Sequence, residues 1–139
     1  MLIVDTGFLV ALFDSSDPYH RKALPFVGSQ KDGWITTWPV VTETMYFLME
    51  RVHVNCAIAL LDDVKSGALQ VWDIPTDQIE HTQSLLRRYK SLPMDFADAS
   101  LVLLAEHLGS GRILTTDQRD FGAYRWKNRK PFVDVMAIA

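Results

Sequence analysis

Four acidic residues lie beside predicted strands and helices in four separate parts of the chain. Asp5 and Asp117 follow short apolar runs, Glu43 lies near the start of an amphipathic segment, and Asp98 near the start of an almost wholly apolar helix. Burying an isolated carboxylate is costly, so acids beside buried elements need a compensating cation. Mg²⁺ and Mn²⁺ prefer oxygen ligands. Their chemistry in such sites is phosphoryl transfer or phosphodiester hydrolysis.

Each acid also has an ordinary structural explanation when it is taken alone. Asp5 begins an Asp-Thr-Gly sequence that suits a turn or a helix N-cap, and Glu43 could be a first-turn acid favoured by the helix dipole. Asp98 could be a helix N-terminal acid behind an N-cap at Asp95, and Asp117 could cap the short segment that follows it. The joint pattern, with two acids at strand ends and two at helix starts, favours a metal site.

Apolar runs and amphipathic segments alternate along the chain, which is typical of α/β folds. A proline after Asp17 and a Glu three residues after Asp77 resemble helix-start signals. Strands are expected over residues 2–5, 34–37, 69–72, 112–115 and 133–138. Helices are expected over residues 8–13, 18–27, 39–52, 57–64, 77–89 and 95–108. We therefore expect an α/β/α arrangement of three layers with a mainly parallel central sheet. Such folds place their sites beyond the carboxyl ends of the strands, where Asp5 and Asp117 are expected.

Length and composition are those of a soluble globular protein. The chain has 139 residues, of which 48% are hydrophobic and 22% charged, so we expect one domain over residues 1–139. Cys56 is the only cysteine, which excludes an intrachain disulfide and points to a reducing cytoplasm. The N-terminus lacks the basic start of a signal peptide, and no uncharged apolar run approaches the length of a membrane span.

The charge distribution leaves two interpretations open for the C-terminal region. A net charge of −3 argues against a protein that coats nucleic acids generally. Residues 112–130 are nonetheless rich in Lys and Arg, which would suit a polyanionic substrate or form an ordinary solvated face. Trp126 could stack on a base, anchor a partner or shield the core. The candidate RNA contacts are Arg119, Arg125, Trp126, Lys127 and Arg129.

Several other chemistries find no support in the sequence. The four histidines lie on unrelated segments, and Cys56 falls beside an apolar helix face, so no nucleophile with a partner is evident. Nucleotide-binding glycine loops are absent. Position 7 is glycine, which removes the Asp-x-Asp pattern of phosphatases, and a receiver domain would need an early acid pair that is missing.

Four motifs together resemble the PIN domain family. They are the opening Leu-Ile-Val-Asp-Thr-Gly, the segment Val-Val-Thr-Glu, the stretch from Asp95 through Asp98-Ala-Ser, and Thr115-Thr-Asp117-Gln-Arg-Asp-Phe121. Their order and spacing are most similar to the VapC-type toxin ribonucleases of toxin–antitoxin pairs, over essentially the whole chain. Thr6-Gly7 departs from the commoner Thr-Ser of that family, so position 7 receives no catalytic role.

The resemblance implies a function and a set of site residues. Asp5, Glu43, Asp98 and Asp117 would hold Mg²⁺ or Mn²⁺, and Thr115 would support the site through a hydrogen bond. Asp98 matches the family's Asp-Ala pair, which leaves Asp95 as an auxiliary or capping acid. The implied protein is an endoribonuclease that acts on RNA, dimerises and is inhibited by a cognate antitoxin. The alternative is a catalytically silent module that keeps the fold and binds RNA or protein.

Overall fold

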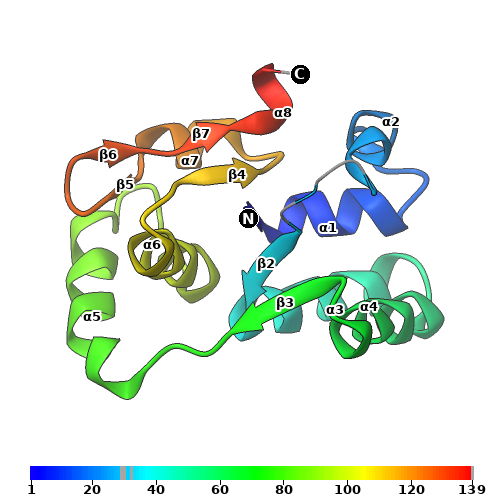
Figure 1. Ribbon diagram of the computed structural model, residues 1–139, viewed down its shortest axis with the longest axis horizontal. Coiled ribbons are helices and arrows are strands. Elements are labelled where there is room, and N and C mark those ends of the chain that lie inside the picture. Colours follow the sequence, from blue (N-terminus) through cyan, green and yellow to red (C-terminus); the bar gives the residue numbers. More distant parts are fainter. Residues whose placement is uncertain (29–30, 32, 139) are drawn as a thin grey trace.

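Five strands form one parallel sheet at the centre of the protein. The computed structural model describes residues 1–28, 31 and 33–138. The strand order is β3-β2-β1-β4-β7, and each neighbouring pair is parallel (Figure 1). The strands are β1 (Leu2–Val4), β2 (Trp34–Thr37), β3 (Leu69–Trp72), β4 (Arg112–Leu114) and β7 (Val133–Asp134). The expected parallel sheet is therefore confirmed.

Helices cover both sides of this sheet and complete the expected three-layer α/β/α architecture. In Figure 1, α5 and α6 lie on one side, and α1 and α4 on the other. None of the helices in the described ranges is long and apolar enough to cross a bilayer. The helices are α1 (Thr6–Phe13), α2 (His20–Ala23), α3 (Trp38–Arg51), α4 (Val54–Ser66), α5 (Ile79–Arg88), α6 (Phe96–Leu108), α7 (Gln118–Ala123) and α8 (Val135–Ile138).

The core forms where the central strand meets helix α6. β1 is buried along its whole length, as expected for a central parallel strand with helices on both sides. From Ala99 to Ala105 every residue of α6 is buried, which explains why this helix shows no polar face in the sequence. Burying one large aliphatic side chain stabilises a fold by roughly 1.5–3 kcal/mol. This packing holds the start of α6 firmly against the carboxyl end of β1.

Glycine ends two helices as the left-handed cap requires. Gly67 follows α4 with a φ of 85°, and Gly109 follows α6 with a φ of 68°. A residue with a Cβ pays a steric cost in this conformation, and glycine does not. The helix end expected at residue 108 is confirmed, and α4 ends at Ser66, two residues later than expected.

Two expected helix starts are wrong. Asp17 accepts a hydrogen bond from the backbone N–H of Tyr19 in a turn, and α2 itself is only four residues long. Pro25 has no N–H to continue the α-helical pattern, so a 3-10 turn over Leu24–Phe26 replaces the expected longer helix. The expected capping box at Asp77 is also absent, because a 3-10 turn (Thr76–Gln78) leads into α5 without a side-chain cap.

The C-terminal region differs from expectation in two places. The strand expected over residues 133–138 ends at Asp134, whose side chain accepts a hydrogen bond from the N–H of Met136 and starts α8. A small hairpin of β5 (Arg125–Trp126) and β6 (Lys130–Pro131) was not expected at all. Lys127 and Asn128 turn between its strands with positive φ angles of 50° and 62°, the conformation that tight hairpin turns favour.

Candidate active site

An acidic pocket of about 470 Å³ opens beyond the carboxyl ends of β1 and β4. All four acids singled out in the sequence line it, although they come from four different elements. Asp17, Asp95 and Asp120 line it as well. Among the described residues of its lining, Arg51 is the one basic side chain. Seven carboxylates around one opening produce a strongly negative potential, which favours bound cations.

Asp5 is the most rigidly held of these acids. It follows β1 and caps helix α1, where its Oδ1 accepts a hydrogen bond from the N–H of Phe8 at 2.8 Å. Its Oδ2 accepts a second hydrogen bond from the hydroxyl of Thr115. Burial raises the pKa of Asp5 to about 7, and these two hydrogen bonds only partly oppose that rise. The Asp5 side chain is therefore held in place, but its hydrogen bonds do not fully offset the cost of burying its negative charge.

Asp98 lies in the first turn of α6 and has a different set of partners. Its Oδ2 accepts a hydrogen bond from the Tyr124 hydroxyl at 2.9 Å, and its backbone N–H donates to Asp95 Oδ1 at 2.8 Å. Burial raises the pKa of Asp98 to about 7, and the charge of Asp95 adds to the rise. Asp95 is the N-cap of α6, so its expected capping role is confirmed.

Glu43 enters the pocket from helix α3. Burial raises its pKa, a hydrogen bond from Thr6 opposes that effect, and the charge of Asp95 adds to it. Asp95 thus interacts electrostatically with both Glu43 and Asp98. The carboxylates therefore repel one another across the pocket.

Thr115 links Asp117, the fourth of these acids, to Asp5. Asp117 caps α7 through a hydrogen bond from the N–H of Asp120 at 3.1 Å. The N–H of Asp117 donates to Thr115 Oγ1 at 2.9 Å, while the Thr115 hydroxyl donates to Asp5. Asp120, which lies in the first turn of α7, also lines the pocket, and burial and Asp117 raise its pKa. One buried hydroxyl therefore couples the strand-end acids.

The donor set of the pocket fits a hard divalent cation. Its ligands would all be carboxylate oxygens, which Mg²⁺ and Mn²⁺ prefer. Within the described residues, no group of three or more acidic, histidine or cysteine side chains is already arranged to hold a metal ion. The fit therefore rests on the oxygen donors and on the gathered negative charge. Burial, and to a smaller extent the charges of neighbouring acids, raises the pKa of both Asp5 and Asp98.

Gly7 allows the start of α1 to approach the segment after β4. A Cβ built at this position would lie 2.1 Å from Thr116 Oγ1, far inside contact distance. Both residues line the pocket. The departure from Thr-Ser noted in the sequence thus has a steric reason, because the Thr116 hydroxyl occupies the space that a side chain at position 7 would need.

Gly7→Ala is expected to lower the free energy of unfolding by about 1–2 kcal/mol, because the added methyl group must displace Thr116. In a Thr116→Ala background the same change should stabilise by roughly 0.5 kcal/mol, since alanine is the better helix former. Urea unfolding of the four proteins measures both effects. Equal costs in the two backgrounds would contradict the steric explanation.

The structure does not bring the candidate RNA contacts into the pocket. None of the five is among the described residues of its lining. Arg119 is exposed beside Asp120 at 3.6 Å, and the Arg125 guanidinium donates to the carbonyls of Gly122 and Tyr124. The β5–β6 turn carries two further candidates, Lys127 and Arg129, both exposed.

Trp126 is a correction to the sequence analysis. It is 6% exposed, its Nε1 donates to the carbonyl of Pro131, and its ring packs against Gly111. Lys127 and Lys130 lie over the ring, with Nζ atoms 5.8 and 4.9 Å from its centroid. The ring is therefore unavailable for stacking on a base. Of the three alternatives, Trp126 is a core residue.

The sequence analysis missed two residues that act on the pocket. Tyr124 contacts Asp98 from 26 positions away, and Arg51 reaches the lining from the last turn of α3. A tyrosine near Phe121 looks like a packing residue in the sequence. No local pattern signals its hydroxyl contact, because the two partners meet only in the folded protein.

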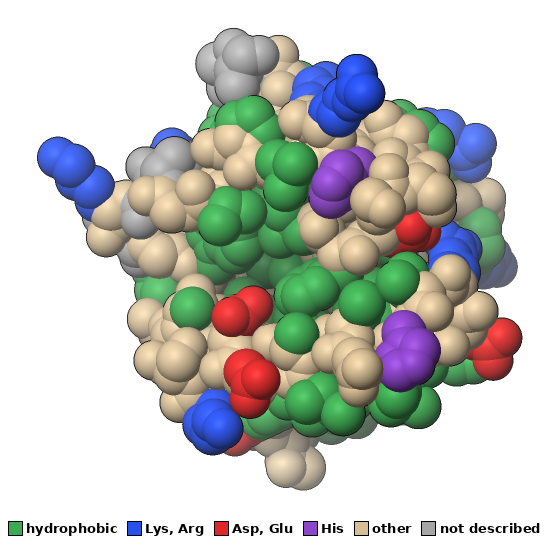
Figure 2. Space-filling view, turned by 90° about the vertical axis from the view of Figure 1, so that its right-hand side faces the viewer, with side chains coloured by type: hydrophobic (Ala, Val, Ile, Leu, Met, Phe, Trp, Pro, Cys, Tyr) green, Lys and Arg blue, Asp and Glu red, His purple; other side chains and the backbone are tan. Residues whose placement is uncertain are grey.

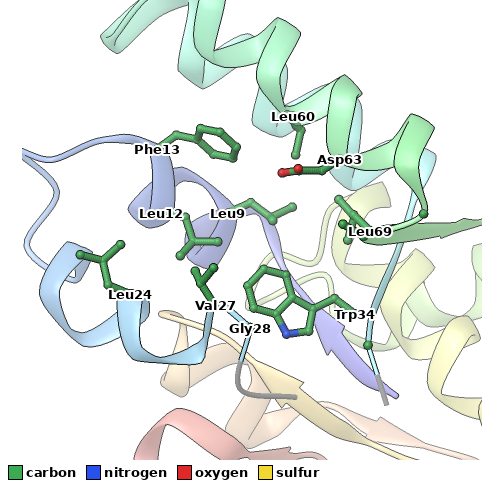
Figure 3. A pocket seen from close by; sticks show the side chains of 13 residues that line it. Leu9, Leu12, Phe13, Leu24, Val27, Gly28, Trp34, Leu60, Asp63 and Leu69 are labelled. Atoms are coloured by element: carbon green, nitrogen blue, oxygen red, sulfur yellow. The ribbon is translucent and has the colours of Figure 1, made fainter. Parts of the chain in front are cut away.

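A second pocket of about 500 Å³ is apolar, and among the described residues its lining shares none with the acidic pocket. Figure 2 shows hydrophobic side chains gathered in a hollow on the face that carries α1, α2 and α4. Figure 3 shows Leu9, Phe13, Leu60 and Trp34 around it, with Asp63 beside them. It offers no set of groups for catalysis, but its apolar lining suits a protein contact.

The family model of the PIN domain matches residues 2–127. The chain is 32% identical over 124 residues to Ribonuclease VapC26 of Mycobacterium tuberculosis, and the match covers 89% of this chain and 92% of that protein. The resemblance found in the four motifs is therefore confirmed.

The fold agrees with a solved member of the same group. The crystal structure of Mycobacterium tuberculosis VapC20, a Sarcin-Ricin loop cleaving toxin, superposes with a TM-score of 0.78 at 24% identity, over 86% of this chain and 92% of that chain. At this identity the likeness bears on the fold alone. The family-model match over residues 2–127 and the 32% identity to the VapC26 ribonuclease show that the chain belongs to the PIN domain family, with a VapC-type ribonuclease among its relatives.

Proposed function

We propose that this protein is a metal-dependent endoribonuclease that hydrolyses RNA phosphodiester bonds, and that it is the toxin of a type II toxin–antitoxin pair. The observation that carries the proposal is the meeting of Asp5, Glu43, Asp98 and Asp117 around one pocket. The chain's membership of the PIN domain family and the ribonuclease among its relatives support the choice of RNA as substrate.

These four acids would hold Mg²⁺ or Mn²⁺ in the proposed enzyme. When bound, such a cation supplies Lewis acidity toward the phosphate and toward the attacking water. Thr115 keeps Asp5 oriented through its hydrogen bond, and Asp95 fixes the first turn of α6 beneath Asp98. Glu43, whose pKa is raised at the pocket rim, is suited to accept a proton from the attacking water.

The partners and location form part of the same proposal. The substrate is RNA, held at its phosphates by exposed basic residues such as Arg119 and Arg129. A cognate antitoxin keeps the enzyme inactive, and the toxin itself forms a homodimer in the cytoplasm. Two apolar surfaces support the proposal of protein partners. One is the hollow beside α1, and the other is a shallow site whose lining includes the exposed side chains of Trp38, Tyr46 and Phe96.

The test is cleavage of a mixed pool of structured RNAs by purified protein without antitoxin. Reactions contain Mg²⁺, Mn²⁺ or EDTA, and Asp98→Asn protein runs beside the wild type. We expect internal cleavage that needs a divalent cation and is lost in the variant. RNA binding without cleavage by folded protein under either metal would instead support the silent binding module.

A further inference from the structure

Tyr124 is a buried tyrosine whose hydroxyl points at an acid of the pocket. Its side chain is completely shielded from solvent, and its ring packs edge to face against Tyr89 and Phe121, each at a centroid distance of 5.1 Å. The hydroxyl donates to Asp98 Oδ2 at 2.9 Å. The aromatic cluster therefore fixes the ring, and through it the position of the hydroxyl.

The Asp98 carboxylate has fewer hydrogen-bond donors than the Asp5 carboxylate, so its orientation depends more on the contact with Tyr124. Among the hydrogen bonds of the described residues, the Tyr124 hydroxyl is the one donor to the Asp98 carboxylate. Asp5 has a donor on each oxygen, from Phe8 and Thr115. The Asp98 backbone is held by Asp95, but that bond leaves the side-chain torsions free. The orientation of the Asp98 carboxylate thus rests on Tyr124.

The arrangement has a clear consequence for a cation. A hydrogen bond to one oxygen of a carboxylate limits its rotation and leaves the other oxygen available as a ligand. Partners of this kind, which hold a ligand and do not touch the metal, commonly contribute 10–100-fold to metal affinity or activity. An unheld acid on the first turn of a helix would lose side-chain entropy each time it bound a cation.

We propose that Tyr124 is a positioning residue that holds the Asp98 carboxylate for the cation of the nuclease site. The inference rests on the proposed function, because it assigns Asp98 to the cation. It adds a residue that lies outside the four acids and outside the motifs on which the family resemblance is based. Tyr124 acts through Asp98 and does not itself touch metal or RNA.

The decisive variant is Tyr124→Phe, which removes the hydroxyl and keeps the ring in its cluster. Its matched control is Tyr89→Phe, which removes a hydroxyl from the adjoining ring, where the partner is the backbone N–H of Arg125 and not an acid. For both proteins we measure Mn²⁺ binding by titration calorimetry, the Mn²⁺ concentration that gives half-maximal cleavage, and the thermal midpoint in EDTA.

We expect Tyr124→Phe to weaken Mn²⁺ binding by about 10–100-fold and to shift half-maximal cleavage to correspondingly higher Mn²⁺. Cleavage at saturating Mn²⁺ should recover most of the wild-type rate, since the ligand itself remains. Tyr89→Phe should bind Mn²⁺ as the wild type does. In an Asp98→Ala background, which already lacks the acceptor of the Tyr124 hydrogen bond, Tyr124→Phe should produce no further loss of binding, because the two residues act through one contact.

Two results would overturn the inference in distinguishable ways. Tyr124→Phe protein that binds Mn²⁺ within twofold of the wild type would show that Asp98 needs no positioning, while the proposed nuclease would stand. Additive losses in the double variant would assign Tyr124 a general structural role. Wild-type protein that binds no Mn²⁺, with Asp98→Asn behaving identically, would remove the metal site and the positioning role together.

Discussion

Asp98→Asn is expected to reduce the rate of RNA cleavage by about two to three orders of magnitude, because a cation in such a site contributes several kcal/mol to the transition state. Asparagine has the shape of aspartate, and its carbonyl oxygen can still accept the Tyr124 hydrogen bond. The change therefore removes the charge and little else. Cleavage rates under excess enzyme, at a fixed Mg²⁺ concentration, measure the effect.

The matched control is Asp77→Asn, which neutralises an exposed acid far along the chain that is not among the described residues of the pocket. Its cleavage rate should equal that of the wild type. Folded Asp98→Asn protein that cleaves within threefold of the wild type would contradict the assignment of Asp98. Equal losses in both variants would mean that net charge, and not this pocket, determines the rate.

The metal-free protein is expected to lose stability as the pH rises from about 4 to about 7. Burial raises the pKa of Asp5 and Asp98 from 3.8 to about 7 in the folded state. Between these values the folded protein binds more protons than the unfolded chain, so the free energy of unfolding falls with pH and levels off above about 7. Each pH unit is ~1.4 kcal/mol for one group, so the loss should approach about 4 kcal/mol for each of the two acids.

Urea unfolding in EDTA between pH 4.5 and pH 8 measures this loss. Asp5→Asn should flatten part of the slope and make the metal-free protein more stable than the wild type at pH 8. Saturating Mg²⁺ at pH 8 should restore the wild-type stability, because a cation that binds only the folded state stabilises it. Equal stability at pH 5 and pH 8 in EDTA would contradict the shifted pKa values. Asp14 does not contribute to this pH dependence. Its hydrogen bonds with Ser16 lower its pKa, so its effect on stability falls below the pH range of the measurement.

Much of the sheet could be predicted because its signals are local. Strands β2 and β3 have the residues expected of them, and β1 and β4 end one residue earlier than expected. Short apolar runs between turn residues identify buried strands wherever they stand in the chain. Gly67 and Gly109 mark helix ends for a similarly local reason, since only the residue's own backbone angle matters.

The elements that were missed depend on contacts between distant parts of the chain. The β5–β6 hairpin has strands of two residues, too short for a periodic pattern, and it is held by Trp126 packing on Gly111. Residues 135–138 are apolar enough for a strand, but Asp134 caps a helix there. Local composition does not distinguish these outcomes.

The residues of the candidate site also differ in whether local sequence patterns could predict them. The four acids could be chosen from their places beside strands and helices, because the ends of parallel strands converge at one edge. Tyr124 could not, since its hydroxyl meets Asp98 only after α6 and α7 have packed. The basic residues near the C-terminus show the opposite error, because a charge cluster in the sequence does not reveal which surface of the fold it occupies.

The residues of the pocket come from distant parts of the chain, so we expect the active site to form late in folding. Asp5 and Thr115 are 110 positions apart and meet only when β1 pairs with β4. Closing a loop of that length is entropically unfavourable and slow compared with local helix formation. A partly folded chain, with helices formed but the sheet incomplete, therefore has its acids dispersed in solvent. We therefore expect a chain in which β1 and β4 have not yet paired to lack the assembled pocket and to be inactive as a nuclease.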